Sequence, residues 1–365
     1  MPAFPAVVER PLLPGSQLKT NYPRNCWWVA ATRVEVTREP LGRVILGRPI
    51  VMYRKEDGSI AVLEDRCVHR WAPLSIGKVV GDNIVCGYHG FTYGADGNCN
   101  HIPTQSVIPP KAKVHSYPVR ERGPFVWVYT GDVNRIDEVA PPPALEWVDD
   151  PAWIVASGTY DLKANYMALK ENVLDLTHFA FVHPTTFSIM DFLRPPDVAV
   201  DGDRVSYEIA FRDTPLPSIY GDSTGIGSEK NATRLFRGAF VSPGIQEATV
   251  EIIDSAPAPG GRGSYNVKVM HLTTPVSMSQ TYYWWIRAQD FGHRPGLREE
   301  LQATVESAFD EDKVVLEATQ RIIDVDLRHR DVPEVSIRAD EAGVRIRRVV
   351  SQMMQREALI DNDPH

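Results

Sequence analysis

Two short stretches of the sequence each combine a cysteine with a histidine. Cys67-Val-His69 comes first, and after sixteen residues from position 70 to 85 it is followed by Cys86-Gly-Tyr-His89. Two such turns facing each other present two thiolates and two imidazoles to a metal. Zinc is one alternative, but paired zinc ligands are usually separated by two to four residues. The tighter Cys67–His69 spacing favours a [2Fe–2S] cluster, with the cysteines on one iron and the histidines on the other.

A second group of polar residues interrupts an apolar segment. Asn172, Asp175 and His178 recur every three residues, and His183 directly precedes Pro184. We predict a helix over residues 166–182 that places the first three side chains on one face. A residue before proline avoids the helical conformation, so the helix should end near His183 and let that imidazole turn back toward His178.

Two histidines and a carboxylate with open positions are typical of non-haem Fe(II) sites. The carboxylate is expected from a long helix over residues 296–323. Asp312 lies seven residues after Val305, on the apolar stripe of that helix, whereas Asp310 and Glu311 fall off it. A carboxylate that faces a core must be paired or bind a metal. We therefore predict Asp312 as the third ligand.

Each of these residues also has a purely structural explanation. Asp312 could belong to a buried ion pair, and His178 and His183 could be hydrogen-bonded core residues. The two remaining cysteines, Cys26 and Cys99, are expected to be ordinary buried thiols.

The elements that must position these residues change in type along the chain. Residues 20–135 consist of short β-rich segments separated by turn signals such as Asp57-Gly58, which predicts an antiparallel β domain. A proline-rich linker is expected at 136–150. Residues 151–365 combine helices with strands over 204–290 and a last helix over 340–359, so the fold class is α+β.

Composition limits the classes of function. Acidic residues outnumber basic ones, 47 to 39, and the net charge of −8 argues against a generic nucleic-acid binder. The 8 Trp, 13 Tyr and 12 Phe exclude a disordered chain. No apolar run approaches the roughly 20 residues of a membrane helix, and no signal peptide is evident. We expect a cytoplasmic protein that contacts neither nucleic acid nor membrane.

Taken together, the two groups resemble the oxygenase (alpha) component of the Rieske non-haem iron oxygenases over nearly the whole chain. The similarity is greatest to the vanillate O-demethylase and dicamba O-demethylase group. It is carried by Asn25-Cys-Trp-Trp-Val-Ala30, Pro40-Leu-Gly-Arg43, Cys67-Val-His-Arg70 with Ala72-Pro-Leu-Ser75, Asn172-Val-Leu-Asp-Leu-Thr-His178, and Glu311-Asp-Lys313.

The resemblance implies an N-terminal Rieske domain and a C-terminal helix-grip domain, in which a curved antiparallel sheet surrounds a long helix. It implies one cluster and one Fe(II) per chain, O2 as co-substrate, and a homotrimer. NADH would supply electrons through a separate flavin/[2Fe–2S] reductase or a ferredoxin. The expected reaction is hydroxylation of a small aromatic substrate, with O- or N-dealkylation.

The resemblance also assigns roles to single residues. Asp175 would link His178 to His89 of a neighbouring subunit. Asp175 and Asn172 are both expected to be catalytic residues. His271, within a strand segment, matches a position that contacts substrate in this group; the alternative is an ordinary strand histidine.

The sequence bears on the potential of the cluster and leaves alternatives for the reaction. Phe91 stands where high-potential Rieske proteins have a serine, and no spare cysteine pair flanks the ligand loops. Fewer hydrogen bonds to sulfur indicate a lower potential, as in oxygenases. Within enzymes, cis-dihydroxylation of an aromatic ring, as on phthalate, is the alternative. From another class, the alternative is a Rieske electron carrier without oxygenase activity.

Overall fold

The computed structural model describes residues 22–184, 186, 192–332 and 334–361. The chain divides into two compact units. The N-terminal unit is Arg24–Glu146 together with Thr274–Ser277. The C-terminal unit comprises Trp147–Thr273 and the chain from Met278 onward, with Tyr22 and Pro23. The division after Glu146 falls inside the predicted linker.

The N-terminal unit is built from three small antiparallel sheets, which confirms the predicted antiparallel β domain. Their strand orders are β1-β10-β9, β2-β3-β4 and β5-β6-β7-β8. The strands are β1 (Trp27–Thr32), β2 (Leu41–Ile45), β3 (Arg48–Arg54), β4 (Ile60–Glu64), β5 (Lys78–Val80), β6 (Asn83–Val85), β7 (Thr92–Tyr93), β8 (Cys99–His101), β9 (Val119–Arg122) and β10 (Phe125–Tyr129). Short 3-10 turns occur at η1 (Leu74–Ile76), η2 (Val133–Glu138) and η3 (Glu146–Val148).

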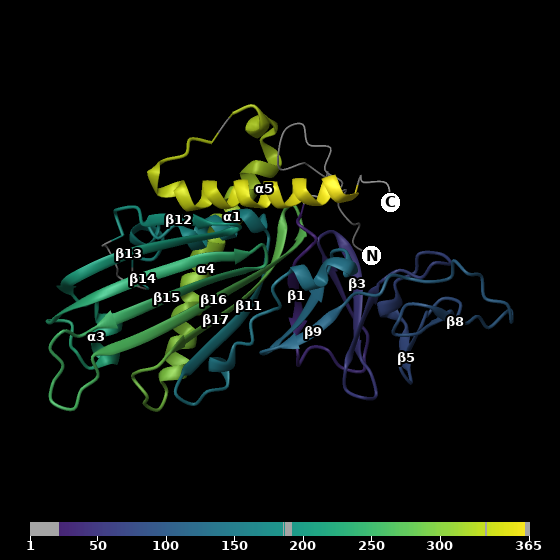
Figure 1. The fold of residues 1–365 in the computed structure, drawn as a ribbon, viewed down its shortest axis with the longest axis horizontal. Helices are drawn as coiled ribbons and strands as arrows, with labels where there is room; N and C mark the ends of the chain where they lie inside the picture. Colours follow the sequence, from purple (N-terminus) through teal and green to yellow (C-terminus); the bar gives the residue numbers. More distant parts are fainter. Residues whose placement is uncertain (1–21, 185, 187–191, 333, 362–365) are drawn as a thin grey trace. The chain divides into compact units, whose positions relative to one another are not determined.

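The C-terminal unit centres on a seven-stranded antiparallel sheet of order β11-β17-β16-β15-β14-β13-β12. The strands are β11 (Ile154–Leu162), β12 (Asp197–Asp201), β13 (Arg204–Pro215), β14 (Asn231–Ser242), β15 (Ile245–Ile253), β16 (Ser264–Ser277) and β17 (Gln280–Gln289). The helices are α1 (Tyr166–Leu174), α2 (Phe179–Val182), α3 (Ser218–Thr224), α4 (Leu297–Val325) and α5 (Glu341–Asp361), with 3-10 turns η4 (Leu327–Arg330) and η5 (Arg338–Asp340). Within this unit, α4 crosses one face of the sheet and α5 lies along its β12–β13 side (Figure 1).

Helix α4 packs on the sheet through the apolar stripe that the sequence predicts. Leu301, Val305 and Leu316 are buried in one cluster with Tyr283 and Trp285 of β17. Full burial of such side chains stabilises a fold by roughly 1.5–3 kcal/mol each. Asp312 lies on the same stripe and is buried, so its carboxylate faces the interior.

Helix α1 is held by α5 as well as by α4. Arg347 of α5 pairs with Glu171 of α1, with its Nη2 atom 2.6 Å from Glu171 Oε2. The backbone of α5 comes close at the same point, because a Cβ added to Gly343 would lie 3.1 Å from Glu171 Cγ. Arg347 therefore anchors α1 to α5.

One expectation about this region is wrong. The helix predicted over 166–182 is not continuous: α1 ends at Leu174, and Asp175 is extended with φ −94° and ψ 107°. The Asp175 carboxylate accepts hydrogen bonds from Thr177 N at 2.7 Å and Thr177 Oγ1 at 2.6 Å. Such a side-chain turn competes with the helix and ends it. Asn172 and His178 therefore do not share one helix face.

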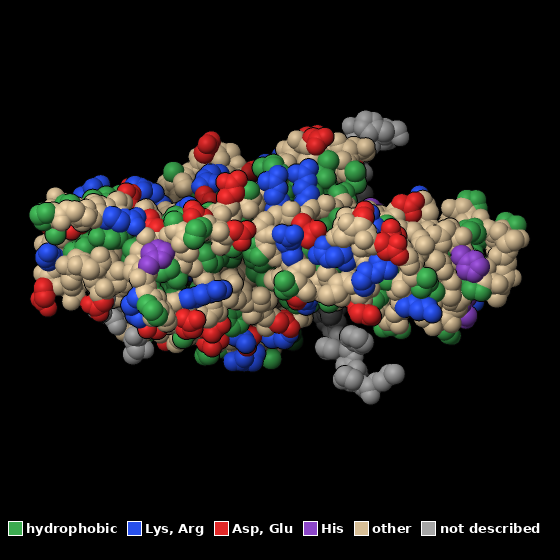
Figure 2. All heavy atoms as spheres, turned by 90° about the horizontal axis from the view of Figure 1, so that it is seen from below, with side chains coloured by type: hydrophobic (Ala, Val, Ile, Leu, Met, Phe, Trp, Pro, Cys, Tyr) green, Lys and Arg blue, Asp and Glu red, His purple; other side chains and the backbone are tan. Residues whose placement is uncertain are grey.

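The surface carries charges of both signs. On the face shown in Figure 2, Lys and Arg side chains are interspersed with Asp and Glu. Among the helices that the structure describes, none has the length and apolar character needed to cross a membrane.

Candidate metal centres

His178, His183 and Asp312 come together in the C-terminal unit. Asp312 Oδ1 lies 3.4 Å from His178 Nε2 and 3.3 Å from His183 Nε2. One ligand atom from each residue lies within 4.8 Å of the others. The three side chains are 14%, 1% and 9% exposed, so the group is shielded from solvent.

The short helix α2 brings the two imidazoles together. His178 precedes the helix and His183 follows it, and the helix ends at Val182, two residues before Pro184. The ring centroids of the two histidines are 5.2 Å apart. The prediction that the helix ends near His183 and returns its ring toward His178 is confirmed.

The state of His178 tests whether this group fits a metal. Both of its ring nitrogens are buried and make no hydrogen bond of normal geometry among the described residues, and Asp312 Oδ1 comes no closer to Nε2 than 3.4 Å. A buried polar atom without a partner costs about 1–3 kcal/mol. Burial, together with His183, lowers the pKa of His178, although Asp312 opposes this. A neutral imidazole is the form that binds metal, and two imidazoles with one carboxylate suit Fe(II).

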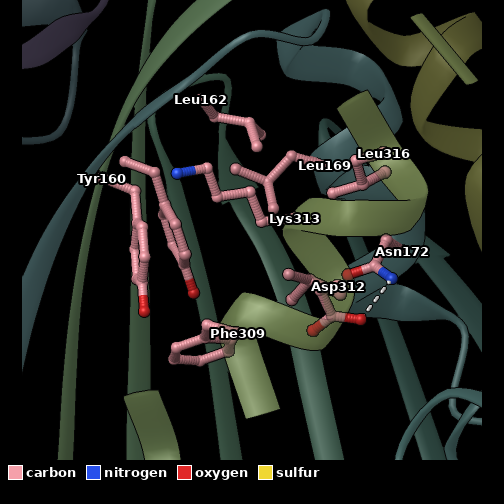
Figure 3. A pocket seen from close by; sticks show the side chains of 10 residues that line it. Tyr160, Leu162, Leu169, Asn172, Phe309, Asp312, Lys313 and Leu316 are labelled. Atoms are coloured by element: carbon pink, nitrogen blue, oxygen red, sulfur yellow. Dashed lines mark hydrogen bonds between the residues drawn. The ribbon is translucent and has the colours of Figure 1, made fainter. Parts of the chain in front are cut away.

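Two neighbouring side chains fix the orientation of the group. Asn172 of α1 donates from Nδ2 to Asp312 Oδ1 at 3.0 Å, and Figure 3 shows these two side chains facing each other from α1 and α4. Glu311 Oε2 lies 2.7 Å from His183 Nδ1, and Thr186 Oγ1 donates to Glu311 Oε1 at 2.8 Å. Burial lowers the pKa of His183, but the hydrogen bonds to Asp312 and Glu311 raise it above its usual value.

A cavity adjoins Asp312. It is lined by Tyr160, Leu162, Leu169, Asn172, Val173, Tyr283, Phe309, Asp312, Lys313 and Leu316. In Figure 3, Tyr160 and Phe309 lie across the cavity from Asn172. Most of the lining is apolar or aromatic, and the enclosed volume of about 10 Å³ is close to that needed by one water molecule.

His271 lies close to residues that line this cavity. Its Nδ1 is 2.7 Å from Tyr283 Oη, and its ring centroid is 5.8 Å from that of Phe309. Burial lowers the pKa of His271 to about 3, so the ring is neutral near pH 7. If the Tyr283 hydroxyl donates to Nδ1, the proton of the imidazole is on Nε2.

In the N-terminal unit, the two Cys-His loops have the same backbone geometry. Cys67 O accepts from Trp71 N and Cys86 O accepts from Gly90 N, at 3.0 and 3.1 Å. Trp71 and Gly90 both have positive φ, 61° and 72°. A tryptophan in this region costs roughly 1–2 kcal/mol, so the loop geometry outweighs the preference of the residue.

The loops separate sulfur from nitrogen. The Cys67 and Cys86 side chains are buried, whereas His69 and His89 are exposed, with ring centroids 4.6 Å apart. Two thiols inside and two imidazoles outside match a [2Fe–2S] cluster whose irons have different ligands.

Tyr93 adds a contact that the sequence analysis missed. Its hydroxyl lies 3.2 Å from Cys67 Sγ and accepts from Val68 N at 3.3 Å. Burial, and then the neighbouring Cys67, raise the pKa of Tyr93, so the neutral phenol can donate to sulfur. Phe91 cannot donate a hydrogen bond to sulfur, and the sequence therefore indicates a low cluster potential. That inference does not include the hydrogen bond from Tyr93 to Cys67. Phe91 itself stacks on His69, with ring centroids 4.9 Å apart.

Two known domain families match this chain, one in the N-terminal region and one in the C-terminal region. Residues 26–118 match the Rieske [2Fe-2S] domain family. Residues 162–356, more than half of the chain, match the vanillate O-demethylase oxygenase C-terminal domain family. The chain belongs to the Rieske non-haem iron oxygenases.

Several characterised proteins are similar to this oxygenase along most of their length. The iron-sulfur subunit of the toluene-4-sulfonate monooxygenase system of Comamonas testosteroni is 33% identical over 87% of this chain and 92% of that protein. The oxygenase component of dicamba O-demethylase from Stenotrophomonas maltophilia is 31% identical over 93% of this chain and 99% of that protein. A crystal structure of dicamba monooxygenase bound to 3,6-dichlorosalicylic acid aligns with a TM-score of 0.81 and 27% identity, covering 92% of this chain and 99% of that one.

These findings confirm the predicted α+β fold, the family and the class of enzyme. This Rieske oxygenase is the oxygenase component of a multicomponent monooxygenase. Its cofactors are those of the family, a [2Fe–2S] cluster and a non-haem iron, and it depends on a partner component for electrons.

Proposed function

We propose that this oxygenase hydroxylates a small aromatic substrate at a methoxy or N-alkyl carbon, which leads to O- or N-dealkylation. The observation that carries this proposal is the group of His178, His183 and Asp312 beside a largely apolar cavity. Relatives named for such reactions include vanillate O-demethylase, dicamba O-demethylase and methylxanthine N1-demethylase.

The chain's own residues prepare the site for iron. His178, His183 and Asp312 would hold it, and iron bound there supplies the activation of O2. Glu311 accepts a hydrogen bond from His183 Nδ1, which would leave Nε2 as the nitrogen that binds iron. Asn172 holds Asp312 Oδ1 in place. The neutral His271 is proposed to donate from Nε2 to a polar group of the substrate.

Electron delivery is proposed to cross between subunits of a homotrimer. Cys67 and Cys86 would hold one iron of the cluster, and His69 and His89 the other. His89 is exposed. The Asp175 carboxylate takes its two bonds from Thr177 on Oδ1, which supports Oδ2 as the atom that accepts from His89 of the neighbouring subunit. A flavin/[2Fe–2S] reductase or a ferredoxin, reduced by NADH, would supply the electrons.

The proposal is tested on purified protein reconstituted anaerobically with iron. We expect three irons per chain and a Rieske-type EPR signal in the reduced state. A compatible reductase and a panel of methoxybenzoates and N-alkyl anilides are then supplied with 18O2. One labelled atom per turnover should enter the released aldehyde, formaldehyde or a larger one, and the second should leave as water, reduced by two electrons from the reductase. Two irons per chain would indicate an electron carrier, and two labelled atoms on a ring would indicate cis-dihydroxylation.

A further inference from the structure

Arg287 is a buried cation on the inner face of the C-terminal sheet. It lies on β17 two residues after Trp285 and four after Tyr283, and alternate residues of a strand point to the same face. Tyr283 and Trp285 both contact Phe309 of α4, with ring centroids 5.4 Å apart in each case. Arg287 therefore points to the side of the sheet on which Phe309 and Asp312 lie.

The charge of Arg287 has no counter-ion among the described residues. The side chain is 9% exposed, and its one hydrogen bond there runs from Nη1 to Gln289 Oε1 at 2.9 Å. Burial lowers the pKa of Arg287 to about 10, and the nearby Tyr220 phenol offsets this only in part. By contrast, Arg237 on β14 contacts two carboxylates, those of Glu208 and Glu251. A buried, unpaired charge is costly unless a partner compensates it.

The free edge of the guanidinium can receive an oxyanion. The hydrogen bond to Gln289 uses Nη1, so the Nε–Nη2 edge makes no hydrogen bond to a described residue. Neither Nε nor Nη2 is among the fully buried polar atoms that lack a partner. That edge presents two parallel N–H groups, the geometry that binds carboxylates and sulfonates in a bidentate manner. Gln289 is fixed in turn, because its Nε2 donates to Phe291 O at 3.0 Å.

Half-buried apolar side chains lie on the strands beside Arg287. The backbone of Asp290 donates to Asn266 O, and counting three residues inward on each strand places Arg287 beside Val269. Val269 pairs with Ala248 of β15, and both side chains are only half-buried. Four residues separate Arg287 from Tyr283 at the metal end, about 13 Å along the strand. An aromatic ring and the arginine side chain can together span this distance.

We propose that Arg287 is the counter-ion for an anionic substrate, so that the substrate is an aromatic carboxylate or sulfonate. Its oxyanion binds the Nε–Nη2 edge, its ring lies against the apolar inner face, and its alkyl group points toward His178, His183 and Asp312. The orientation rests on the proposed function. The binding of the anion does not, because it requires neither iron nor O2.

The experiment is calorimetric titration of the anaerobic holoenzyme, without reductase. One pair of probes is 4-methoxybenzoate and the neutral 4-methoxybenzamide; the other is 4-methylbenzenesulfonate and the neutral sulfonamide. We expect the wild type to bind at least one anion at least 10-fold more tightly than its neutral counterpart. The preferred pair identifies carboxylate or sulfonate. Arg287→Gln should remove that preference and leave the affinity for the neutral probe within about 2-fold.

A matched control separates binding from structure. Arg237→Gln removes a cation from the same sheet at a position 45% exposed and already paired, and it should retain the preference for the anion. Without ligand, Arg287→Gln should melt no lower than the wild type, because it removes an uncompensated buried charge. Equal affinity of the wild type for anion and neutral probe overturns the proposal. So does a variant that melts lower and loses both probes equally. Turnover of neutral aromatics without anion preference would keep the proposed function and refute this inference.

Discussion

Substitution of Glu311 should weaken the binding of iron without touching a metal ligand. Its carboxylate is 2.7 Å from His183 Nδ1 and is held on its other oxygen by Thr186. Glu311→Gln keeps an acceptor but removes the charge, and charged hydrogen bonds are about twice as strong as neutral ones. Glu311→Ala removes the bond altogether.

The size of the effect follows from this single bond. A hydrogen bond to a charged group contributes about 1.5–3 kcal/mol, and each 1.4 kcal/mol corresponds to about tenfold in affinity. We expect Glu311→Ala to raise the dissociation constant for Fe(II) by about 10–100-fold, the range seen when partners of metal-bound histidines are removed. Glu311→Gln should fall at the lower end of that range.

The assay is anaerobic titration of protein that retains its cluster but has lost the mononuclear iron, with Fe(II) in competition with a chelator. The cluster absorbance serves as an internal check that the N-terminal unit is intact. Asp310→Asn, a substitution of the preceding acid on α4, is the control and should bind Fe(II) like the wild type. An unchanged Fe(II) affinity in Glu311→Ala would refute the reasoning.

Three further substitutions test the remaining assignments. Asp312→Ala should lose the mononuclear iron and turnover while keeping the cluster spectrum, as read by iron analysis and EPR; the same loss in Asp310→Ala instead would show that the helix phase is wrong. Asp175→Asn should retain both centres but reduce turnover at least ~100-fold, and single-turnover electron transfer should slow with it; near-normal turnover would remove Asp175 from the electron route. Tyr93→Phe deletes the hydroxyl near Cys67 Sγ and should lower the cluster midpoint potential by some tens of millivolts, measured by redox titration; an unchanged potential would show that the hydroxyl does not donate to sulfur.

Residues that chemistry restricts to a few types could be located from the sequence. The two Cys-His loops span only positions 67–89, and their spacing is enough to bring the four side chains together. Asp312 could be selected among its acidic neighbours because α4 is long and regular, so that helical periodicity holds over the whole apolar stripe. His183 could be placed because proline restricts the residue before it.

Contacts between distant segments could not be located in this way. Glu311 falls off the apolar stripe and yet contacts His183, 128 residues away, because the turn after α2 meets the flank of α4. Asp175 ends α1 because its carboxylate accepts hydrogen bonds from Thr177. The apolar spacing of the surrounding residues predicts a continuous helix and gives no sign of this turn. In the sequence, Arg287 looks like an ordinary strand residue. Only the folded sheet shows that it is buried and that no carboxylate among the described residues pairs with it.

The two partners that hold α1 have a consequence for biosynthesis. With nine residues, this helix is too short to persist alone in water. Its contacts with Asp312 and Arg347 involve residues 140 and 176 positions later in the chain. A ribosome needs roughly 10–35 s to add the longer of these stretches. The four cluster ligands, by contrast, leave the ribosome within a single stretch of 23 residues near the start. Insertion of the [2Fe–2S] cluster can therefore begin during translation, whereas the mononuclear iron must be acquired after the chain is almost fully synthesised.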